Sequence, residues 1–177
     1  MDGFIEEKRE LTVEDNLLDL AFALSPELEA LQWRYVLSWG RHPRDLDLYL
    51  SVSKDGEKKC TAFWQHKTCT FPGGTAVLDV DEQQGYGPET ITVTLDSAEA
   101  ATGLGFNVHV ERYAGEGTTG ASGAVVRAFN GNKAVGTWNV PTTLEATWDV
   151  YEGTPPLPQL KGGLLLSRES LPKVLVA

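Results

Sequence analysis

The chain has 177 residues, of which 41% are hydrophobic, and this is enough for the core of one domain. Its net charge of −10 and isoelectric point of about 4.7 argue against nucleic acid as a partner, because phosphate binding needs clustered lysine and arginine. The charge also argues against an anionic membrane surface, and no apolar run is long enough to span a bilayer.

Residues 1–30 are interpreted as an N-terminal segment, either a strand or the remnant of a preceding module. Apolar alternation favours a strand over Leu18–Leu24, although Asp15 would also suit the start of a short helix. Ser25-Pro26 ends either element. The chain starts with an acidic stretch that lacks the apolar core of a secretory signal, so we expect either a cytoplasmic protein or a fragment of a larger exported one.

Residues 31–152 show apolar and polar residues alternating in one short segment after another, which indicates β-strands. Asp55-Gly56 and Asn130-Gly131 favour tight hairpin turns between them. With almost no helix expected, the pattern predicts an all-β fold, an antiparallel β-sandwich. The expected strands are Trp33–Trp39, Leu46–Val52, Cys60–Trp64 with Lys67–Phe71 as its return, Ala76–Val80, Ile91–Leu95, Phe106–Val110, Ala124–Phe129, Ala134–Val140 and Leu144–Val150.

Two connections and the end of the chain complete this organisation. A helical turn is expected at Ser97–Ala101, and a mobile loop at Ala114–Gly123, which is rich in glycine, serine and threonine. The segment 153–177 begins with a proline-rich stop and continues as an apolar tail, which would pack back on the domain or contact a partner.

Two acidic pairs with the same spacing indicate a metal site. Alternate residues of a strand face the same side, so Asp45 with Asp47, and Asp79 with Asp81, are expected to present their carboxylates together. On neighbouring strands these charges would repel one another, and Ca²⁺, which accepts oxygen ligands, would remove the repulsion. The sequence therefore predicts one calcium site with the ligands Asp45, Asp47, Asp79, Asp81 and Glu89.

Other interpretations of these acids stay open. Asp79, Asp81 and Glu89 would also suit turn capping, in which a carboxylate accepts bonds from nearby backbone amides. The acidic set would also suit the paired carboxylates of a glycosidase. An EF-hand is excluded, because Gln84 stands where that loop needs its glycine.

The cysteines Cys60 and Cys69 lie on the two arms of one predicted hairpin. In an oxidising compartment they would form a disulfide, and otherwise they would be free thiols. The five tryptophans suit core packing, with a sugar-stacking platform as the alternative. His109 falls on the polar face of a strand, and His42 lies beside the turn before Asp45.

Several motifs occur in order along the chain: Ala23-Leu-Ser-Pro, Tyr35-Val-Leu-Ser-Trp-Gly, Pro43-Arg-Asp-Leu-Asp-Leu-Tyr-Leu50, Leu78-Asp-Val-Asp, Gly85-Tyr-Gly-Pro-Glu-Thr-Ile-Thr92, Val108-His-Val and Ser122-Gly-Ala-Val-Val-Arg-Ala-Phe-Asn-Gly131. Together, over residues 23–151, they resemble the YfaP-like proteins, a bacterial family of poorly characterised function with relatives in microbial eukaryotes. The resemblance implies an immunoglobulin-like or transthyretin-like sandwich, often one module of a larger exported or surface protein, and no established catalytic activity. Many members carry a His or polar residue after Asp-Leu-Asp, where this chain has Leu48 and Tyr49.

These features predict a non-catalytic, calcium-binding module that acts in binding, adhesion or assembly of a larger protein. Its partner would be a protein or a carbohydrate, and an extracellular or cell-surface location would follow if the chain is part of an exported protein. The alternatives are a carbohydrate-active enzyme that uses the acidic cluster, and an intracellular structural subunit.

Overall fold

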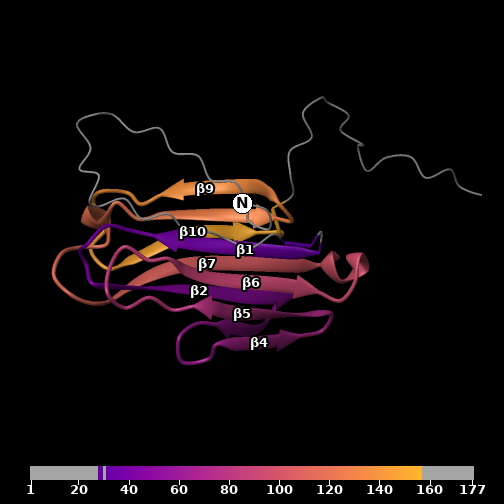
Figure 1. Cartoon of the computed structure of the whole chain (residues 1–177). Coiled ribbons are helices and arrows are strands. Elements are labelled where there is room, and N and C mark those ends of the chain that lie inside the picture. Colours follow the sequence, from indigo (N-terminus) through magenta and orange to yellow (C-terminus); the bar gives the residue numbers. More distant parts are fainter. Residues whose placement is uncertain (1–27, 30, 157–177) are drawn as a thin grey trace, which may run out of the picture.

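The structure, a computed structural model, describes residues 28–29 and 31–156, and within them ten strands form two antiparallel sheets (Figure 1). The six-stranded sheet has the order β4 (Thr68–Phe71), β5 (Gly74–Val80), β6 (Glu89–Leu95), β1 (Gln32–Ser38), β8 (Val125–Asn130) and β9 (Lys133–Asn139). The four-stranded sheet has the order β10 (Thr147–Gly153), β7 (Leu104–Ala114), β2 (Asp45–Lys54) and β3 (Glu57–Ala62).

The predicted all-β antiparallel sandwich is confirmed, whereas its immunoglobulin-like or transthyretin-like character stays a prediction. Helical geometry in the described residues is confined to the 3₁₀ turns η2 (Ala98–Ala101) and η3 (Gly120–Ser122). No helix in those residues is long and apolar enough to cross a membrane. The strand predicted over Leu18–Leu24 and the apolar tail beyond residue 156 lie outside the described residues.

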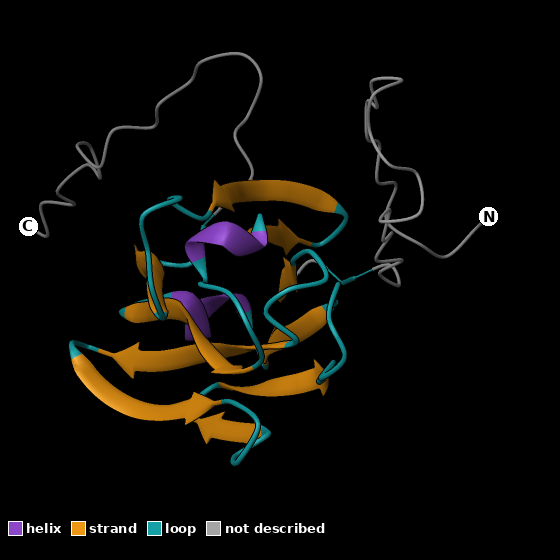
Figure 2. Ribbon diagram, turned by 90° about the vertical axis from the view of Figure 1, so that its left-hand side faces the viewer, coloured by secondary structure: helices purple, strands orange, loops and turns teal. Residues whose placement is uncertain are grey.

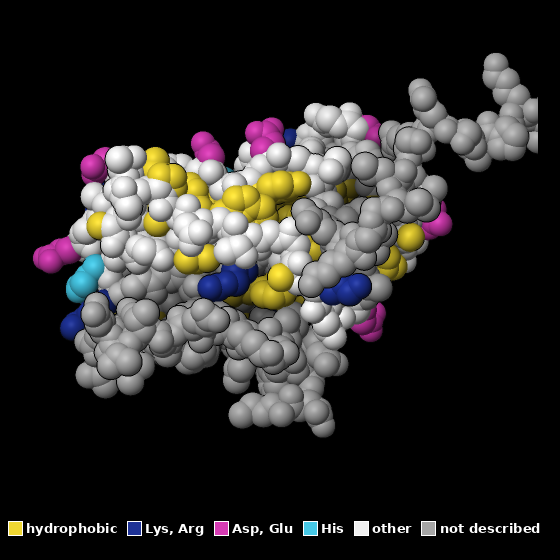
Figure 3. Space-filling view, turned by 90° about the horizontal axis from the view of Figure 1, so that it is seen from above, with side chains coloured by type: hydrophobic (Ala, Val, Ile, Leu, Met, Phe, Trp, Pro, Cys, Tyr) yellow, Lys and Arg dark blue, Asp and Glu magenta, His cyan; other side chains and the backbone are white. Residues whose placement is uncertain are grey.

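The core lies between the sheets and follows the alternation of the sequence. Leu46, Leu48 and Leu50 on β2 are fully buried, while Tyr49 between them faces outward and is only half-buried. Phe106 on β7 meets Trp33 of β1 edge-on, with ring centroids 6.5 Å apart, so aromatic contacts join the two sheets. On the side of the molecule where β9 lies, hydrophobic side chains also reach the surface in a band (Figure 3).

Tight turns hold neighbouring strands where the sequence places them. Asp55 and Gly56 connect β2 to β3 with φ angles of 54° and 81°, both in the left-handed region that a two-residue hairpin of this kind requires. The pairing of β8 with β9 around Gly131 also follows the prediction. Both hairpins could be predicted from the sequence because asparagine or aspartate followed by glycine adopts such turns at little energetic cost.

The prediction that Lys67–Phe71 returns along Cys60–Trp64 is wrong. Strand β4 pairs with β5 in the other sheet, and only an isolated bridge between Phe63 and His66 closes the turn after β3. The chain changes sheets here because Cys69 and Phe71 are buried in the core on the side of the six-stranded sheet. A change of sheet leaves the same alternation in the sequence as a hairpin does.

The loop at residues 114–123, predicted to be mobile, packs against the domain. Thr119 and Ser122 are buried, and the Thr119 hydroxyl donates a hydrogen bond of 2.6 Å to the carbonyl of Ala146. The Ser122 hydroxyl donates to the carbonyl of Thr119 and accepts a 3.0 Å bond from the Ala124 amide. This serine therefore has a structural role in the loop.

Candidate functional site

Four acidic residues stand at the end of the sandwich where β2 and β6 begin, which is the end that faces the viewer in Figure 2. Asp45 and Asp47 stand at the start of β2, Asp81 directly follows β5, and Glu89 begins β6. These positions are neighbours because β2 and β6 start, and β5 ends, at the same end of the two sheets. The four carboxylates are close enough there to repel one another and raise one another's pKa values.

The cluster is buried to a degree that is rare for carboxylates. The exposed fractions are 3% for Asp45, 4% for Asp47 and 0% for Glu89. Glu89 lies on the same side of β6 as Ile91, so its side chain points between the sheets. Ionised groups without a compensating charge are costly in such surroundings.

One oxygen of Glu89 has a clear structural role. Glu89 Oε1 accepts a 3.1 Å hydrogen bond from the backbone amide of Leu48. This amide needs a side-chain acceptor because β3 pairs with β2 only from Leu50 onward, so the first part of β2 lacks a neighbour on that side. The Glu89 carboxylate therefore accepts the hydrogen bond that a neighbouring strand would otherwise accept from the Leu48 amide.

Two other carboxylate oxygens in the cluster have no partner. Glu89 Oε2 and Asp45 Oδ1 are both inaccessible to solvent and make no hydrogen bond within the described residues. Buried polar atoms are nearly always paired in native proteins, so each such atom calls for an explanation. A proton or a cation bound among the carboxylates would supply one.

Burial and mutual repulsion both raise the pKa values of the cluster. Loss of solvent raises the pKa of Glu89 from its ordinary 4.5 to about 9, and the charges of Asp47, Asp81 and Asp45 add to the effect. Burial, followed by the repulsion of Asp45 and Asp81, raises the pKa of Asp47 to about 7. The pKa of Asp45 is also raised, mainly by burial. Without a cation, the cluster therefore holds protons at neutral pH.

Lys67, in the turn before β4, touches the cluster. Lys67 Nζ lies 2.9 Å from Asp81 Oδ2, and its side chain is 55% exposed, whereas that of Asp81 is 13% exposed. The ammonium group pairs with one carboxylate at the rim, and the charge of Arg44 offsets part of the effect of burial on the pKa of Asp45. Nothing in the sequence indicated that Lys67 contacts the cluster, since an exposed lysine beside a short strand is common.

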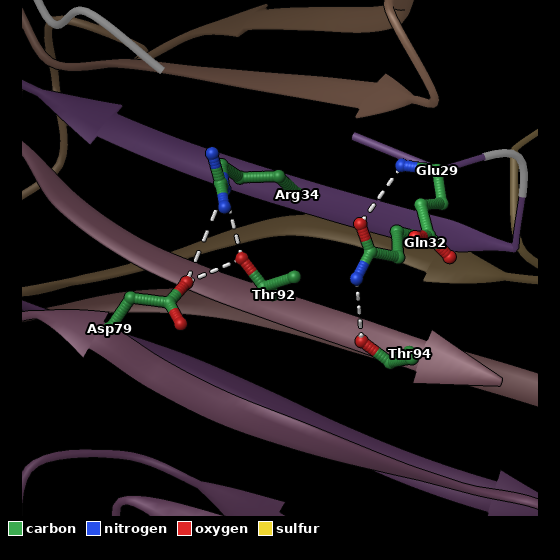
Figure 4. A network of polar contacts seen from close by, with 6 residues as sticks. All are labelled: Glu29, Gln32, Arg34, Asp79, Thr92 and Thr94. Carbon is green, nitrogen blue, oxygen red and sulfur yellow. Dashed lines mark hydrogen bonds and ion pairs between the residues drawn. The ribbon is translucent and has the colours of Figure 1, made fainter. Parts of the chain in front are cut away.

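The structure does not bring Asp79 into the cluster. Two successive residues, Asp79 and Val80, face outward because the register of β5 against β6 shifts at this point, as in a β-bulge. Asp79 accepts a hydrogen bond from Thr92 and lies 4.0 Å from the guanidinium of Arg34, on the outer face of the six-stranded sheet (Figure 4). The expectation that Asp79 and Asp81 share a face is wrong, since one extra residue reverses the alternation.

The loop between β5 and β6 holds Asp81 and Glu89 in place. Glu82 caps this loop, because its Oε1 accepts bonds of 2.9 Å and 2.8 Å from the amides of Gln83 and Gln84. The Tyr86 carbonyl accepts a bond from the Trp39 amide, so it is already engaged. Gly85 has a φ of 87°, and a Cβ there would lie 2.8 Å from the carbonyl of Arg41. Only glycine allows this close approach.

The carboxylates do not converge tightly enough to form a metal site as they stand. Within residues 28–29 and 31–156, no group of three or more His, Cys, Asp and Glu side chains is placed to hold a metal ion. Asp45, Asp47, Asp81 and Glu89 come together as a repulsive, partly protonated cluster. Side-chain rotation would be required for their oxygens to surround one ion.

Cys60 and Cys69 are joined by a disulfide, with their Cα atoms 5.6 Å apart. The bond links β3 in one sheet to β4 in the other, so it ties the two layers together at one edge. It also anchors the turn that carries Lys67. The two cysteines are not hairpin neighbours as predicted, because each strand pairs with a different partner.

Comparisons with known proteins assign no family to this chain. No family model matches the chain, and no curated protein matches it. A solved structure of a protein of unknown function, SAV2460, is similar at a TM-score of 0.42 and 13% sequence identity, with 74% of this chain and 94% of that chain covered.

Proposed function

We propose that this chain is a non-catalytic, calcium-binding β-sandwich module that acts in binding, adhesion or assembly of a larger protein. The observation that carries the proposal is the pair of buried, unpartnered oxygens, Glu89 Oε2 and Asp45 Oδ1, within one acidic cluster. A calcium ion accepts about six to eight oxygens in a flexible geometry, which suits carboxylates that come from separate strands. The YfaP-like motifs, which include Asp45, Asp47, Asp81 and Glu89, support the same proposal.

Calcium binding would require a modest rearrangement of the cluster. The carboxylates of Asp45, Asp47, Asp81 and Glu89 would rotate toward one ion, and Glu89 would release its proton. Lys67 would leave Asp81, which is feasible because more than half of the lysine side chain is exposed. The ion would then neutralise the repulsion that raises the pKa values of Glu89 and Asp47.

The glycosidase alternative is weaker because a sugar substrate would need access to the carboxylates. Glu89 has the raised pKa that a general acid needs, but its side chain is fully buried, so a sugar cannot reach it. Asp45 and Asp47 are almost as inaccessible. A calcium ion is much smaller than a sugar, so it can bind among carboxylates that a sugar cannot reach.

The disulfide supports an exported location, since such bonds persist in oxidising compartments. Membership of the YfaP-like family and the extracellular or cell-surface location are parts of the proposal and rest on the ordered motifs and on this bond. Localisation of the full-length gene product would test this part separately from calcium binding.

Thermal unfolding of the protein with calcium, magnesium or a chelator tests the calcium proposal. A ligand that binds only the folded state stabilises it by about 2.7 kcal/mol at a hundredfold excess over Kd, so the melting temperature should rise with calcium and rise less with magnesium. Asp47→Asn should abolish the shift. Asp79→Asn is the matched control, because Asp79 lies outside the cluster, and it should keep the shift. An unchanged melting temperature at millimolar calcium would leave the acids as a protonated structural cluster.

A further inference from the structure

The outer face of the four-stranded sheet is hollowed, at a distance from the acidic cluster. The groove has a volume of about 790 Å³, within the range of roughly 300–1,000 Å³ that is common for small-molecule sites. Its floor consists of small residues: Ser51 and Ser53 on β2, Gly105 on β7 and Gly153 on β10. A Cβ on Gly105 would lie 2.6 Å from Ser53 Oγ, so a larger residue would fill the floor.

His109 lines one side of the groove and belongs to a row of packed rings. Tyr49 stacks on His109 of the neighbouring strand, with ring centroids 4.5 Å apart and an interplanar angle of 11°. On its other side Tyr49 stacks on Phe63, at 5.1 Å. Stacking against Tyr49 fixes the orientation of the His109 ring, so this side of the groove is pre-formed. The turn at Asp55 and Gly56 closes the opposite side.

The groove continues across the sheet. A second hollow of about 400 Å³, lined by residues of β7 and β10, shares Asn107 and Glu152 with the first. The two together cross β2, β7 and β10 roughly at right angles to the strands. An elongated ligand made of several small units fits this shape better than a single compact one.

The polar groups of the groove are mixed in kind. The Asn107 carboxamide lines the groove and can both donate and accept hydrogen bonds. Ser51 and Thr61 share a hydroxyl–hydroxyl bond of 2.8 Å, so each keeps capacity for another partner. Lys58 and Glu152 face the groove with opposite charges, and neither has an ion-pair partner in the described part of the chain.

We propose that this groove binds a short, neutral oligosaccharide. Sugar hydroxyls both donate and accept, which matches the hydroxyls and carboxamide of the floor. A phosphorylated or otherwise anionic ligand would meet Asp55 and Glu152 against one Lys58, so the charge balance disfavours it. The proposal does not rest on calcium, because the groove begins at Ser51 and the carboxylates lie at the other end of β2.

The test uses cello-, xylo-, manno-, malto- and chitohexaose as probes, each titrated into the ¹⁵N-labelled protein and followed by NMR shifts. At least one should bind at millimolar concentration or better and shift the amides of Ser51, Ser53, Asn107 and Glu152. Asn107→Ala should weaken that binding about tenfold, since a side-chain hydrogen bond within a bound complex is lost. Asn139→Ala is the matched control, because Asn139 is exposed on β9 in the other sheet, and it should bind normally.

Three results would overturn the proposal. These are no shift with any of the five hexasaccharides, shifts that map away from the groove, or equal binding by the Asn107→Ala and Asn139→Ala variants. Binding of spermidine in the groove with no saccharide binding would assign it to a cationic ligand instead. Saccharide binding should be the same in calcium and in a chelator, so failure of the calcium proposal and failure of this one are separable.

Discussion

Glu89→Gln is expected to change how the stability of the protein depends on pH. The substitution keeps the size of the side chain and an acceptor for the Leu48 amide, and it removes the group whose pKa burial raises from 4.5 to about 9. In the wild-type protein without calcium, the unfolded chain loses the Glu89 proton near pH 4.5, while the folded protein keeps it to about pH 9. The wild-type free energy of unfolding therefore falls as pH rises through this window.

The size of the effect follows from the two pKa values. Each pH unit inside the window costs the wild-type protein about 1.4 kcal/mol relative to Glu89→Gln, and the difference reaches about 3 kcal/mol by pH 7. Urea unfolding in the presence of a chelator, followed by tryptophan fluorescence at several values between about pH 5 and pH 8, measures it. Glu145→Gln is the control, because Glu145 is exposed, and it should follow the wild-type curve.

Calcium should reverse which of the two proteins is the more stable at neutral pH. With saturating calcium, the wild-type protein gains stability from an ionised Glu89, whereas Glu89→Gln has lost a charged ligand and gains little. A stability difference between the two proteins that is flat across this pH range in chelator would refute the reasoning. It would mean that Glu89 is ionised or already satisfied in the folded protein.

Three further predictions concern the surroundings of the cluster and the frame that holds it. Lys67→Met should raise calcium affinity by calorimetry, because the ammonium group no longer competes for Asp81; unchanged affinity would show that the 2.9 Å ion pair does not oppose the ion. Reduction of the disulfide should lower the free energy of unfolding by about 2–3 kcal/mol in urea titrations, given the short loop that it closes; an unchanged midpoint would contradict this. Gly87→Ala should lower the melting temperature, because φ is 78° there and a Cβ would lie 2.9 Å from the Trp39 ring; a neutral effect would argue against this loop geometry.

The sheets could be predicted because each strand carries its own periodic signal. Alternation along β2 and β6, and the Asp55-Gly56 turn, are local features, and local sequence specifies them. The partner of β4 could not be predicted in this way. Alternation tells which residues face inward, but the choice between pairing with β3 and pairing with β5 depends on how Phe71 packs in the whole sandwich.

In the candidate site, too, local features could be predicted from the sequence and features set by strand packing could not. The spacing of Asp45 and Asp47, and the glycines before Glu89, predicted that these acids meet at one end of the domain, and in the structure they lie close enough there to raise one another's pKa values. The β-bulge that turns Asp79 outward has no signature in the sequence, because it arises from the register of β5 on β6. The contact of Lys67 with Asp81 depends on the same change of sheet that was mispredicted.

Calcium titration of chelator-stripped protein by isothermal calorimetry at neutral pH, in two buffers of different ionisation enthalpy, is the most direct test of the central claim. Glu89 holds a proton without the ion, and ligand carboxylates bind calcium in the ionised form. The account predicts saturable binding of one ion, release of about one to two protons on binding because Asp47 is also partly protonated at neutral pH, and loss of calcium binding in Glu89→Gln. Absence of binding heat at millimolar calcium in both buffers, or binding without proton release that Glu89→Gln retains, would contradict it.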